Sequence, residues 1–436
     1  MTAAAGPLVV HPDNPRYFAD PGGSPVYLTG SHTWNNLQDL GGSVFDFDDF
    51  LDRLESWGHN FFRLWTWEQG HGVQWAQTRA DNEVSPTVYM RSGAGASAFD
   101  LERLNDEYFR RQSERVAAAL ERGIYAAVML FQGFSVDHLK EGVPWERHPL
   151  RAGNNVNGID GDPEGKGDGS ATHTLAIPEV TAIQEAYVRR VVENVNEFDN
   201  VLYEITNESP PYSTEWQYHM IEFVKAAEAA LPKQHPVGMT FQYEGGLNRT
   251  LYDSPADWVS PNPDGGWQDD PTGDCLGKVV ISDTDHLWGI GGDRAWVWKT
   301  FCRGHNPVFM DTWDDLLIPA TGNSYRDVDP DEIRRAMGET RSFALRMDLA
   351  RCVPRGELAS TGYCLSDGES EFLVYQPPSA GAGEFTVKLA AGAYSVEWHD
   401  PVKGGAAGTA ALDAPGGPVS LTPPSEGEAV AYIRRA

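Results

Sequence analysis

The strongest constraint on the fold is an alternation of apolar strands and amphipathic helices that continues through the first 350 or so residues. Apolar runs with strand character lie at 26–32, 61–65, 124–131, 201–206, 236–241, 257–260, 278–282 and 307–310. Segments with helical spacing lie between most of them, at 45–57, 105–122, 178–198, 214–230, 294–303 and 331–351. Strands that alternate with helices are typical of a parallel sheet with helical crossovers, and eight such units predict an α/β fold, the (β/α)8 TIM barrel. The sixth strand has the weakest pattern.

The residue pattern of the sequence changes after residue 351. Short alternating runs at 371–375, 385–389 and 394–398 are separated by Gly, Pro and Ser. They predict a small antiparallel β-sandwich domain. The expected organisation is therefore a barrel over 1–351 and an accessory β-sandwich over 352–436. Short strands around residues 8–19 either cover the bottom of the barrel or pair with the C-terminal domain.

Charge and composition narrow the possible partners. The chain of 436 residues has a formal net charge of -29, which repels phosphate backbones and anionic lipid. We therefore expect no nucleic-acid and no membrane partner. The N-terminus lacks the basic start and apolar run of a signal peptide, which predicts a cytoplasmic protein. The oligomeric state stays open.

Metal and cofactor signals are weak. The four cysteines are scattered without a CxxC pair, and only a Cys352–Cys364 disulfide stays open. The segment Asp160–Asp168 has oxygen ligands at alternate positions, but Ala171 stands where a calcium loop ends in Glu, so a solvated loop is preferred. No cofactor and no metal site are predicted.

Polar side chains collect where the predicted strands end. The longest connections follow strands, so they build a cleft on the C-terminal face of the barrel, where barrel enzymes carry their catalytic groups. Two carboxylates across such a mouth are what glycoside hydrolysis needs. The candidate catalytic residues are Glu208, Asp283 and Asp285. The candidate substrate-binding residues are His32, Trp34, Arg63, Trp65, Asn207, Glu244, His286, Asp311 and Trp313.

Two motifs carry a resemblance to a known family. Gly58-His-Asn-Phe-Phe-Arg63 and Val201-Leu-Tyr-Glu-Ile-Thr-Asn-Glu208 resemble strands two and four of clan A glycoside hydrolases, whose familiar members are the family 5 cellulase-like enzymes. The resemblance implies that Glu208 is the acid/base, that Asn207 holds the sugar 2-hydroxyl and that Arg63 supports the nucleophile. It also implies that Trp313 stacks on sugar. The segment 394–401 resembles the collagen-binding-type β-domain that follows many bacterial barrel glycosidases.

The seventh strand departs from the family pattern. The clan has a Glu nucleophile there, whereas this chain has Asp283, with Asp285 two residues on. Aspartate is one methylene shorter, which leaves both a direct nucleophile and a base acting through water open. Glu204 has the same parity as Glu208, so it is expected to point into the barrel and pair with Arg63.

The favoured prediction is a glycosidase, exo-acting on small glycosides or oligosaccharides, because the loops at 66–103, 132–177 and 261–277 are long enough to enclose a pocket. One alternative is a metal-dependent barrel hydrolase that uses Asp283, Asp285, His286 and His32. The other is a carbohydrate-binding protein without catalytic activity that kept the barrel.

Overall fold

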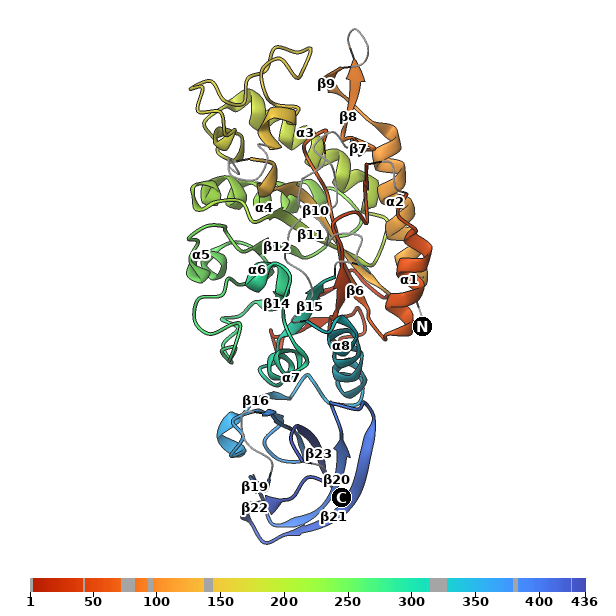
Figure 1. The fold of residues 1–436 in the computed structure, drawn as a ribbon, viewed down its shortest axis with the longest axis vertical. Helices are drawn as coiled ribbons and strands as arrows, with labels where there is room; N and C mark the ends of the chain where they lie inside the picture. The colour runs from red at the N-terminus through yellow and green to blue at the C-terminus, as the bar shows by residue number, and fades with distance from the viewer. Residues whose placement is uncertain are drawn as a thin grey trace.

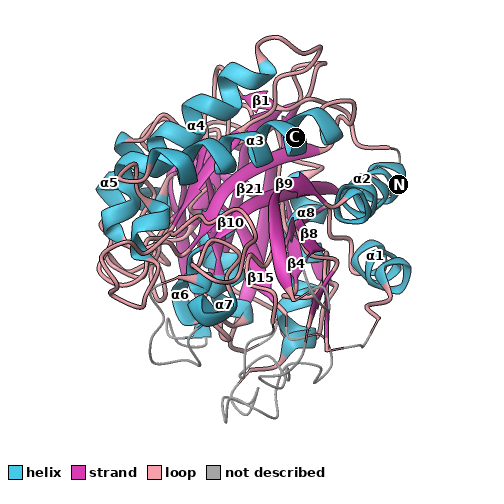
Figure 2. Cartoon of the chain, turned by 90° about the horizontal axis from the view of Figure 1, so that it is seen from above, coloured by secondary structure: helices cyan, strands magenta, loops and turns pink. Residues whose placement is uncertain are grey.

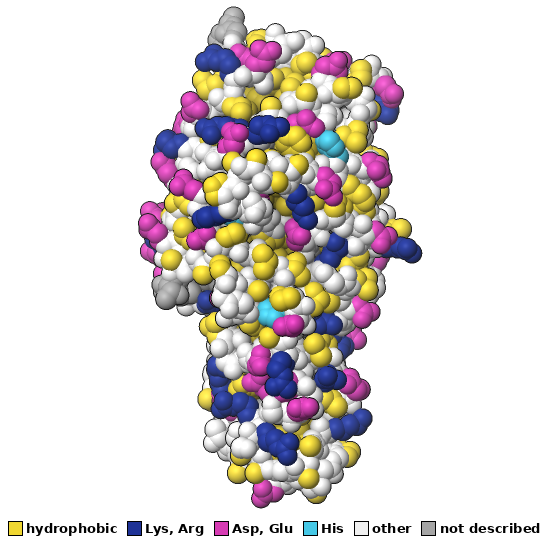
Figure 3. All heavy atoms as spheres, turned by 180° about the vertical axis from the view of Figure 1, so that it is seen from behind, with side chains coloured by type: hydrophobic (Ala, Val, Ile, Leu, Met, Phe, Trp, Pro, Cys, Tyr) yellow, Lys and Arg dark blue, Asp and Glu magenta, His cyan; other side chains and the backbone are white. Residues whose placement is uncertain are grey.

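The computed structural model describes residues 3–41, 44–71, 83–92, 97–136, 144–311, 313, 328–378, 383–424 and 426–436. The chain forms an elongated body in which a barrel stands above a smaller β-domain (Figure 1). Within the described ranges, no helix combines the length and apolar character that a membrane crossing requires. On the face in Figure 3, basic side chains lie among acidic ones instead of gathering in one patch.

The eight predicted barrel strands are present, and their spatial order follows the chain. Each strand runs parallel to its neighbours, in the sheet order β4-β15-β14-β13-β12-β11-β10-β6. The strands are β4 (Gly30–His32), β6 (Phe61–Leu64), β10 (Tyr125–Gln132), β11 (Val201–Asn207), β12 (Val237–Thr240), β13 (Trp258–Ser260), β14 (Val279–Asp283) and β15 (Asn306–Met310). The weak sixth prediction is confirmed as β13.

Helices surround these strands, as the view from above shows (Figure 2). The six predicted helices are confirmed as α1 (Phe47–Ser56), α2 (Asp106–Glu121), α3 (Pro178–Val195), α4 (Thr214–Glu228), α7 (Arg294–Cys302) and α8 (Pro330–Ala344). Side chains of Asp46, Asn105, Asp293 and Asp329 accept hydrogen bonds from the first free N–H groups of α1, α2, α7 and α8. Two short helices, α5 (Asn248–Asp253) and α6 (Thr284–Trp288), were not predicted. The last helix ends at Ala344, seven residues before the predicted end at residue 351.

The seam between β4 and β6 is closed largely by one asparagine. Asn60 donates its backbone N–H to the Thr29 carbonyl at 3.0 Å, and its Oδ1 accepts the Thr29 N–H at 3.0 Å. Its Nδ2 donates to the Tyr27 carbonyl at 2.9 Å. A Cβ on Gly30 would collide with the Phe61 carbonyl, so glycine is what allows these two strands to approach.

The barrel interior changes from apolar to charged within two residues. Side chains two apart on a strand share a face, and three strands make the same change: Phe61 then Arg63, Leu202 then Glu204, Ile281 then Asp283. A second buried cluster packs against the charged layer, and it consists of Trp34, Trp65, Trp67 and Phe134 with Leu40, Val84, Met129 and Met310. The charged groups thus lie between an apolar floor and this largely aromatic cluster.

The N-terminal strands cover the bottom of the barrel. Strands β1 (Val9–Val10), β2 (Phe18–Ala19) and β3 (Pro25–Val26) form their own antiparallel sheet. Leu8 and Phe18 pack with the inward residues at the barrel floor. The segment predicted as one strand at 26–32 is therefore two: Val26 pairs with Phe18 of β2, and only Gly30–His32 enter the barrel.

The C-terminal domain is a β-sandwich. Six strands form one antiparallel sheet, in the order β16-β17-β18-β23-β20-β21. They are β16 (Val353–Pro354), β17 (Cys364–Ser366), β18 (Glu371–Gln376), β20 (Gly392–His399), β21 (Ala406–Ala414) and β23 (Ala429–Arg435). The second layer pairs β19 (Phe385–Leu389) with β22 (Gly417–Leu421). One face of the larger sheet packs on this pair, and the other face, including Leu373 and Tyr432, joins the barrel core.

The loop predicted at 66–103 contains structure of its own. Strand β5 (Asp39–Leu40) pairs with β7 (Val84–Ser85), and β8 (Tyr89–Ser92) forms a hairpin with β9 (Ala98–Leu104). Parts of the predicted pocket loops, at 72–82, 93–96 and 137–143, lie outside the described residues. All four cysteines are buried free thiols, so Cys352 and Cys364 form no disulfide.

Candidate active site

Arg63 is the centre of the charged layer. Its Nε donates to Glu204 Oε2 at 2.8 Å and its Nη2 donates to Glu204 Oε1 at 2.5 Å, a bidentate pair that confirms the predicted contact. Nη1 reaches Oδ2 of Asp283 at 3.0 Å and Oδ2 of Asp285 at 3.3 Å. Nη2 also donates to Asn207 Oδ1 at 2.5 Å. One buried cation therefore organises residues from β6, β11, β14 and α6.

The Asp283 carboxylate has three close polar partners. Its Oδ2 lies 2.8 Å from His32 Nε2 and 3.0 Å from Arg63 Nη1, while its Oδ1 accepts the Asp285 N–H at 2.9 Å. Burial alone would raise the pKa of this carboxyl, but the charges of His32 and Arg63 and the hydrogen bond with His32 outweigh burial and lower the pKa. Asp283 is thus a buried anion that also caps helix α6.

Asp285 has the opposite electrostatic environment. Burial raises the pKa of its carboxyl to about 6, the charge of Asp283 adds to this rise, and Arg63 only partly opposes it. Within the described part of the chain, Oδ2 bonds Arg63 and is the only Asp285 oxygen with a side-chain partner. The side chain is 7% exposed, against 1% for Asp283. Asp285 is therefore the carboxylate of this pair that a ligand in the mouth can reach.

Asn207 and His286 join the same network. His286 Nε2 lies 3.0 Å from Asn207 Oδ1, and its Nδ1 lies 2.7 Å from Ser260 Oγ. Burial, together with the charge of Arg63, keeps the pKa of His286 well below its usual value, so the ring is neutral. With Asn207 Oδ1 as acceptor, Nε2 carries the proton and Nδ1 accepts from Ser260. Asn207 Nδ2 then donates to Gln132 Oε1 at 3.2 Å.

Glu208 follows the end of β11 and is half-buried. Its φ of 52° places it in the left-handed region, which non-glycine residues seldom adopt. Such conformations collect at functional sites because the surroundings must hold them in place. Glu208 directly follows Asn207, whose Oδ1 is bound by Arg63 and His286.

Aromatic side chains and two free donors line the rim above this network. The Trp65 ring stacks on His32 at 5.7 Å between centroids, and the Arg63 guanidinium lies 4.9 Å from the Trp65 centroid. Trp34 packs against Trp65 at 6.4 Å. Trp65 Nε1 and Gln132 Nε2 are buried donors that have no hydrogen-bond partner among the residues described. A ligand with hydroxyl oxygens would satisfy such donors.

Three of the predicted substrate-binding residues lie in other surroundings. Glu244 is exposed in a turn after β12. Asp311 is fully buried and receives two hydrogen bonds from Arg334, at 2.7 Å and 2.6 Å. Trp313 is 6% exposed and packs on Phe45, Phe50 and Trp57. Their roles toward a ligand stay predictions. The Asp311 N–H donates to the carbonyl of His32, the residue paired with Asp283, at 2.9 Å.

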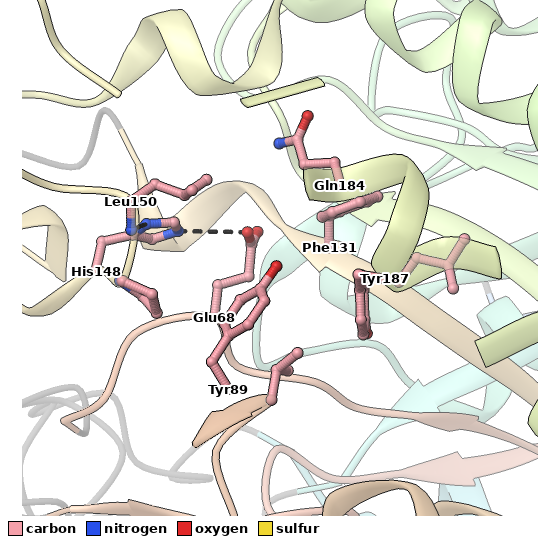
Figure 4. Close-up of a pocket in the computed structure, with 10 residues that line it drawn as sticks. Glu68, Tyr89, Phe131, His148, Leu150, Gln184 and Tyr187 are labelled. Atoms are coloured by element: carbon pink, nitrogen blue, oxygen red, sulfur yellow. Dashed lines mark hydrogen bonds and ion pairs between the residues drawn. The ribbon is translucent and has the colours of Figure 1, made fainter. Parts of the chain in front are cut away.

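One buried cluster was absent from the sequence prediction. Glu68, which follows β6, accepts the Gln132 N–H at 2.8 Å, and its carboxylate lies 3.3 Å from His148 Nε2 and 3.2 Å from His173 Nε2. Figure 4 shows the His148 ring in contact with the Glu68 carboxylate. Both side chains line a small cavity of about 20 Å³, together with Tyr89, Gln184 and Tyr187. Burial would raise the pKa of Glu68, but the charge of His173 and the hydrogen bonds of both histidines lower it to about 2. No local signal in the sequence marks the cluster, because His148 and His173 lie 80 and 105 residues after Glu68 in the chain.

Comparison with known proteins adds structural relatives only. No protein-family model and no curated protein sequence matches the chain. A glycoside hydrolase family 5 protein from Bacteroides vulgatus is similar in structure, with a TM-score of 0.66 over 99% of this chain and 93% of its own, at 13% sequence identity. A second structure, described as a glycoside hydrolase, has a TM-score of 0.62 over 100% of this chain and 99% of its own, at 12% identity. At these identities the likeness shows the fold of both domains.

Proposed function

We propose that this protein is a glycosidase that cleaves a glycosidic bond with Glu208 and Asp285. The observation that carries the proposal is the pair of unlike aspartates around Arg63, one locked as an anion and one left reachable with a raised pKa. A carboxyl group whose pKa lies near 6 is ionised at neutral pH and can accept a proton there, as a general base must. The two solved relatives that carry the name glycoside hydrolase support the same chemistry.

Each group has a defined task in this proposal. Glu208 gives its proton to the glycosidic oxygen as the bond to the leaving group breaks. Asp285, ionised at neutral pH, attacks the anomeric carbon or takes the proton of an attacking water. Asp283 holds Arg63 and caps α6, the helix that carries Asp285. Asn207, fixed through its Oδ1 by Arg63 and His286, presents its Nδ2 side to the sugar 2-hydroxyl.

The substrate in this proposal is a small glycoside or an oligosaccharide cleaved from its end. Aromatic side chains suit the apolar face of a sugar ring, and Trp34 and Trp65, which are 4% and 2% exposed, lie in the wall of the site. The unpartnered donors Trp65 Nε1 and Gln132 Nε2 suit its hydroxyl oxygens. The strong negative charge favours a neutral or cationic sugar over a phosphorylated one.

The test is a panel of glycosides with the wild type and two isosteric variants. We expect Glu208→Gln and Asp285→Asn each to lower kcat about a hundredfold or more, with unchanged circular dichroism. Asp13→Asn, at an exposed position beside the strands that cover the bottom of the barrel, serves as the matched control and retains full activity. NMR of the first product anomer then reports whether Asp285 attacks the sugar or activates water.

Two outcomes would reject the proposal. Full turnover in both variants would remove the carboxylate pair from the reaction. Sugar binding without product on any glycoside would favour a carbohydrate-binding protein instead. Activity that is lost in EDTA and restored by zinc or manganese would favour a metal-dependent hydrolase.

A further inference from the structure

The backbone of Glu208 is strained, and something must hold it. A φ of 52° is unfavourable for a non-glycine residue, because its Cβ then crowds the following carbonyl oxygen. Relaxation of φ would swing the Glu208 side chain away from its present direction, because the side chain leaves from the same Cα. The neighbours that fix this conformation therefore set where its carboxyl group lies.

Gly133 supports the Glu208–Ser209 peptide from one side. A Cβ built on Gly133 would lie 2.5 Å from the Glu208 carbonyl carbon and 2.6 Å from its oxygen, so the two backbones are in contact. Gly133 directly follows Gln132, whose N–H is bound by Glu68. The support is thus tied to the Glu68 cluster at its base.

Ser209 anchors the peptide from the other side. Its Oγ lies 3.0 Å from His173 Nδ1 and 2.7 Å from Thr206 Oγ1. His173 is fixed in turn, because its Nε2 lies 3.2 Å from Glu68 Oε1 and its ring stacks on Trp216 at 4.4 Å. Ser209 and His173 are both fully buried, so water does not compete for these hydrogen bonds.

Glu68 links both supports. The same Oε1 accepts the Gln132 N–H and faces His173 Nε2, so the carboxylate ties the end of β10 to the loop that carries His173. The Glu68 carboxylate accepts from His173 Nε2, and the other ring nitrogen, Nδ1, bonds the Ser209 hydroxyl. The imidazole ring therefore links Glu68 to Ser209.

We propose that Glu68, His173 and Ser209 form a clamp that holds Glu208 in its left-handed conformation and so positions its carboxyl group for proton transfer. The proposal rests on the role of Glu208 as the acid. None of the three touches the reacting atoms in this scheme, and they are positioning residues.

The test uses leaving groups of different acidity. A poor leaving group such as an alkyl or sugar alcohol needs the proton of Glu208, whereas a dinitrophenolate leaves without it. We expect Ser209→Ala to lower kcat about tenfold or more on alkyl glycosides and less than about twofold on the dinitrophenyl glycoside. Ser254→Ala, which removes another buried hydroxyl far along the chain, is the control and changes neither. Equal losses on both substrates would overturn the proposal.

A second measurement separates positioning from general damage. In a Glu208→Gln background, Ser209→Ala should lower the residual kcat no further, because the clamp then has no acid to position. The same holds for Glu68→Gln, which keeps the shape of the side chain if Ser209→Ala folds poorly. An undiminished further loss in that background would contradict the clamp.

The crystal structure of Ser209→Ala gives a readout that does not depend on turnover. We expect Glu208 to leave the left-handed region. If its φ stays near the wild-type value, the clamp is rejected even where the glycosidase activity is confirmed. If the wild type hydrolyses no glycoside while φ changes as expected, the proposed function and the proton-transfer role of the clamp fail, and only its hold on the Glu208 backbone stands.

Discussion

Arg63 carries one positive charge among three carboxylates, those of Glu204, Asp283 and Asp285. One cation cannot stabilise three buried anions equally, so the carboxyl with the weakest contact holds its proton to a higher pH. Asp285, at 3.3 Å and with a single contact, is that group. The same imbalance that leaves Asp285 reachable also brings its pKa to about 6, close to the working range of a base.

The raised pKa of Asp285 determines how the activity depends on pH. A base must be ionised, so kcat/KM should fall as the pH drops through about 6. Asp283→Asn removes a neighbouring negative charge and leaves more of Arg63 for Asp285, so the pKa of Asp285 falls. We expect the acid limb of the residual kcat/KM profile to move to lower pH, while the exposed Asp13→Asn leaves it in place. An acid limb that moves upward or stays would exclude Asp285 as the titrating base.

At the scale of elements, the barrel depends on how its first and second strands meet. The ends of β4 and β6 are joined by Asn60, whose side chain makes two hydrogen bonds to main-chain groups of Tyr27 and Thr29. Asn36 acts in the same way higher on the seam, donating to the Arg63 carbonyl at 2.7 Å and accepting the Trp65 N–H at 2.8 Å. The side-chain amides of Asn60 and Asn36 thus take the place of backbone hydrogen bonds between the two strands, beside Arg63.

We expect Asn60→Ala to lower the free energy of unfolding by about 2 to 4 kcal/mol, because it removes two hydrogen bonds and leaves the buried Thr29 N–H without a partner. Urea unfolding followed by tryptophan fluorescence measures the change. Asn60→Asp keeps the acceptor for Thr29 and loses only the donor to Tyr27, and comparison of the two variants apportions the loss. A change below about 0.5 kcal/mol in Asn60→Ala would show that the seam does not depend on this residue.

At the scale of the whole molecule, the two domains share a buried interface. The Trp298 ring of α7 stacks on Tyr375 of β18 at 6.1 Å, and Phe343 of α8 packs edge-on against Tyr432 of β23 at 5.6 Å. Arg294 Nη2 pairs with Glu428 Oε1 at 2.7 Å, and the Tyr375 hydroxyl donates to Glu428 Oε2 at 3.0 Å. Barrel core and sandwich sheet are therefore parts of one continuous apolar cluster.

We expect the wild type to unfold in one calorimetric transition. Tyr375→Ala removes the contact with Trp298 and the hydrogen bond to Glu428 without touching the sandwich interior, so the heat absorption should split into two transitions. Phe385→Ala, which removes a ring from the sandwich interior, should lower the temperature of a single transition instead. Two transitions in the wild type would contradict the coupling of the domains.

The sequence by itself determined the architecture. Eight apolar strands, six amphipathic helices and the change to alternating strands after residue 351 follow from local periodicity, and the structure confirms each of these elements, although the last helix ends seven residues early. The pairing of Arg63 with Glu204 also followed from strand parity alone. The segment at 26–32 was wrong as a single strand, because Val26 finds its partner in β2, which no local pattern reveals.

The tertiary structure decided the character of the site. Asp283 and Asp285 look equivalent in the sequence, and only their contacts with His32 and Arg63 make one a locked anion and the other a reachable acid of raised pKa. Glu68, His148 and His173 carry no shared motif, and they meet because the loop after β10 folds back over β6. Local periodicity fixes which face of an element is buried, whereas pKa values and hydrogen-bond partners depend on distances between residues far apart in the chain.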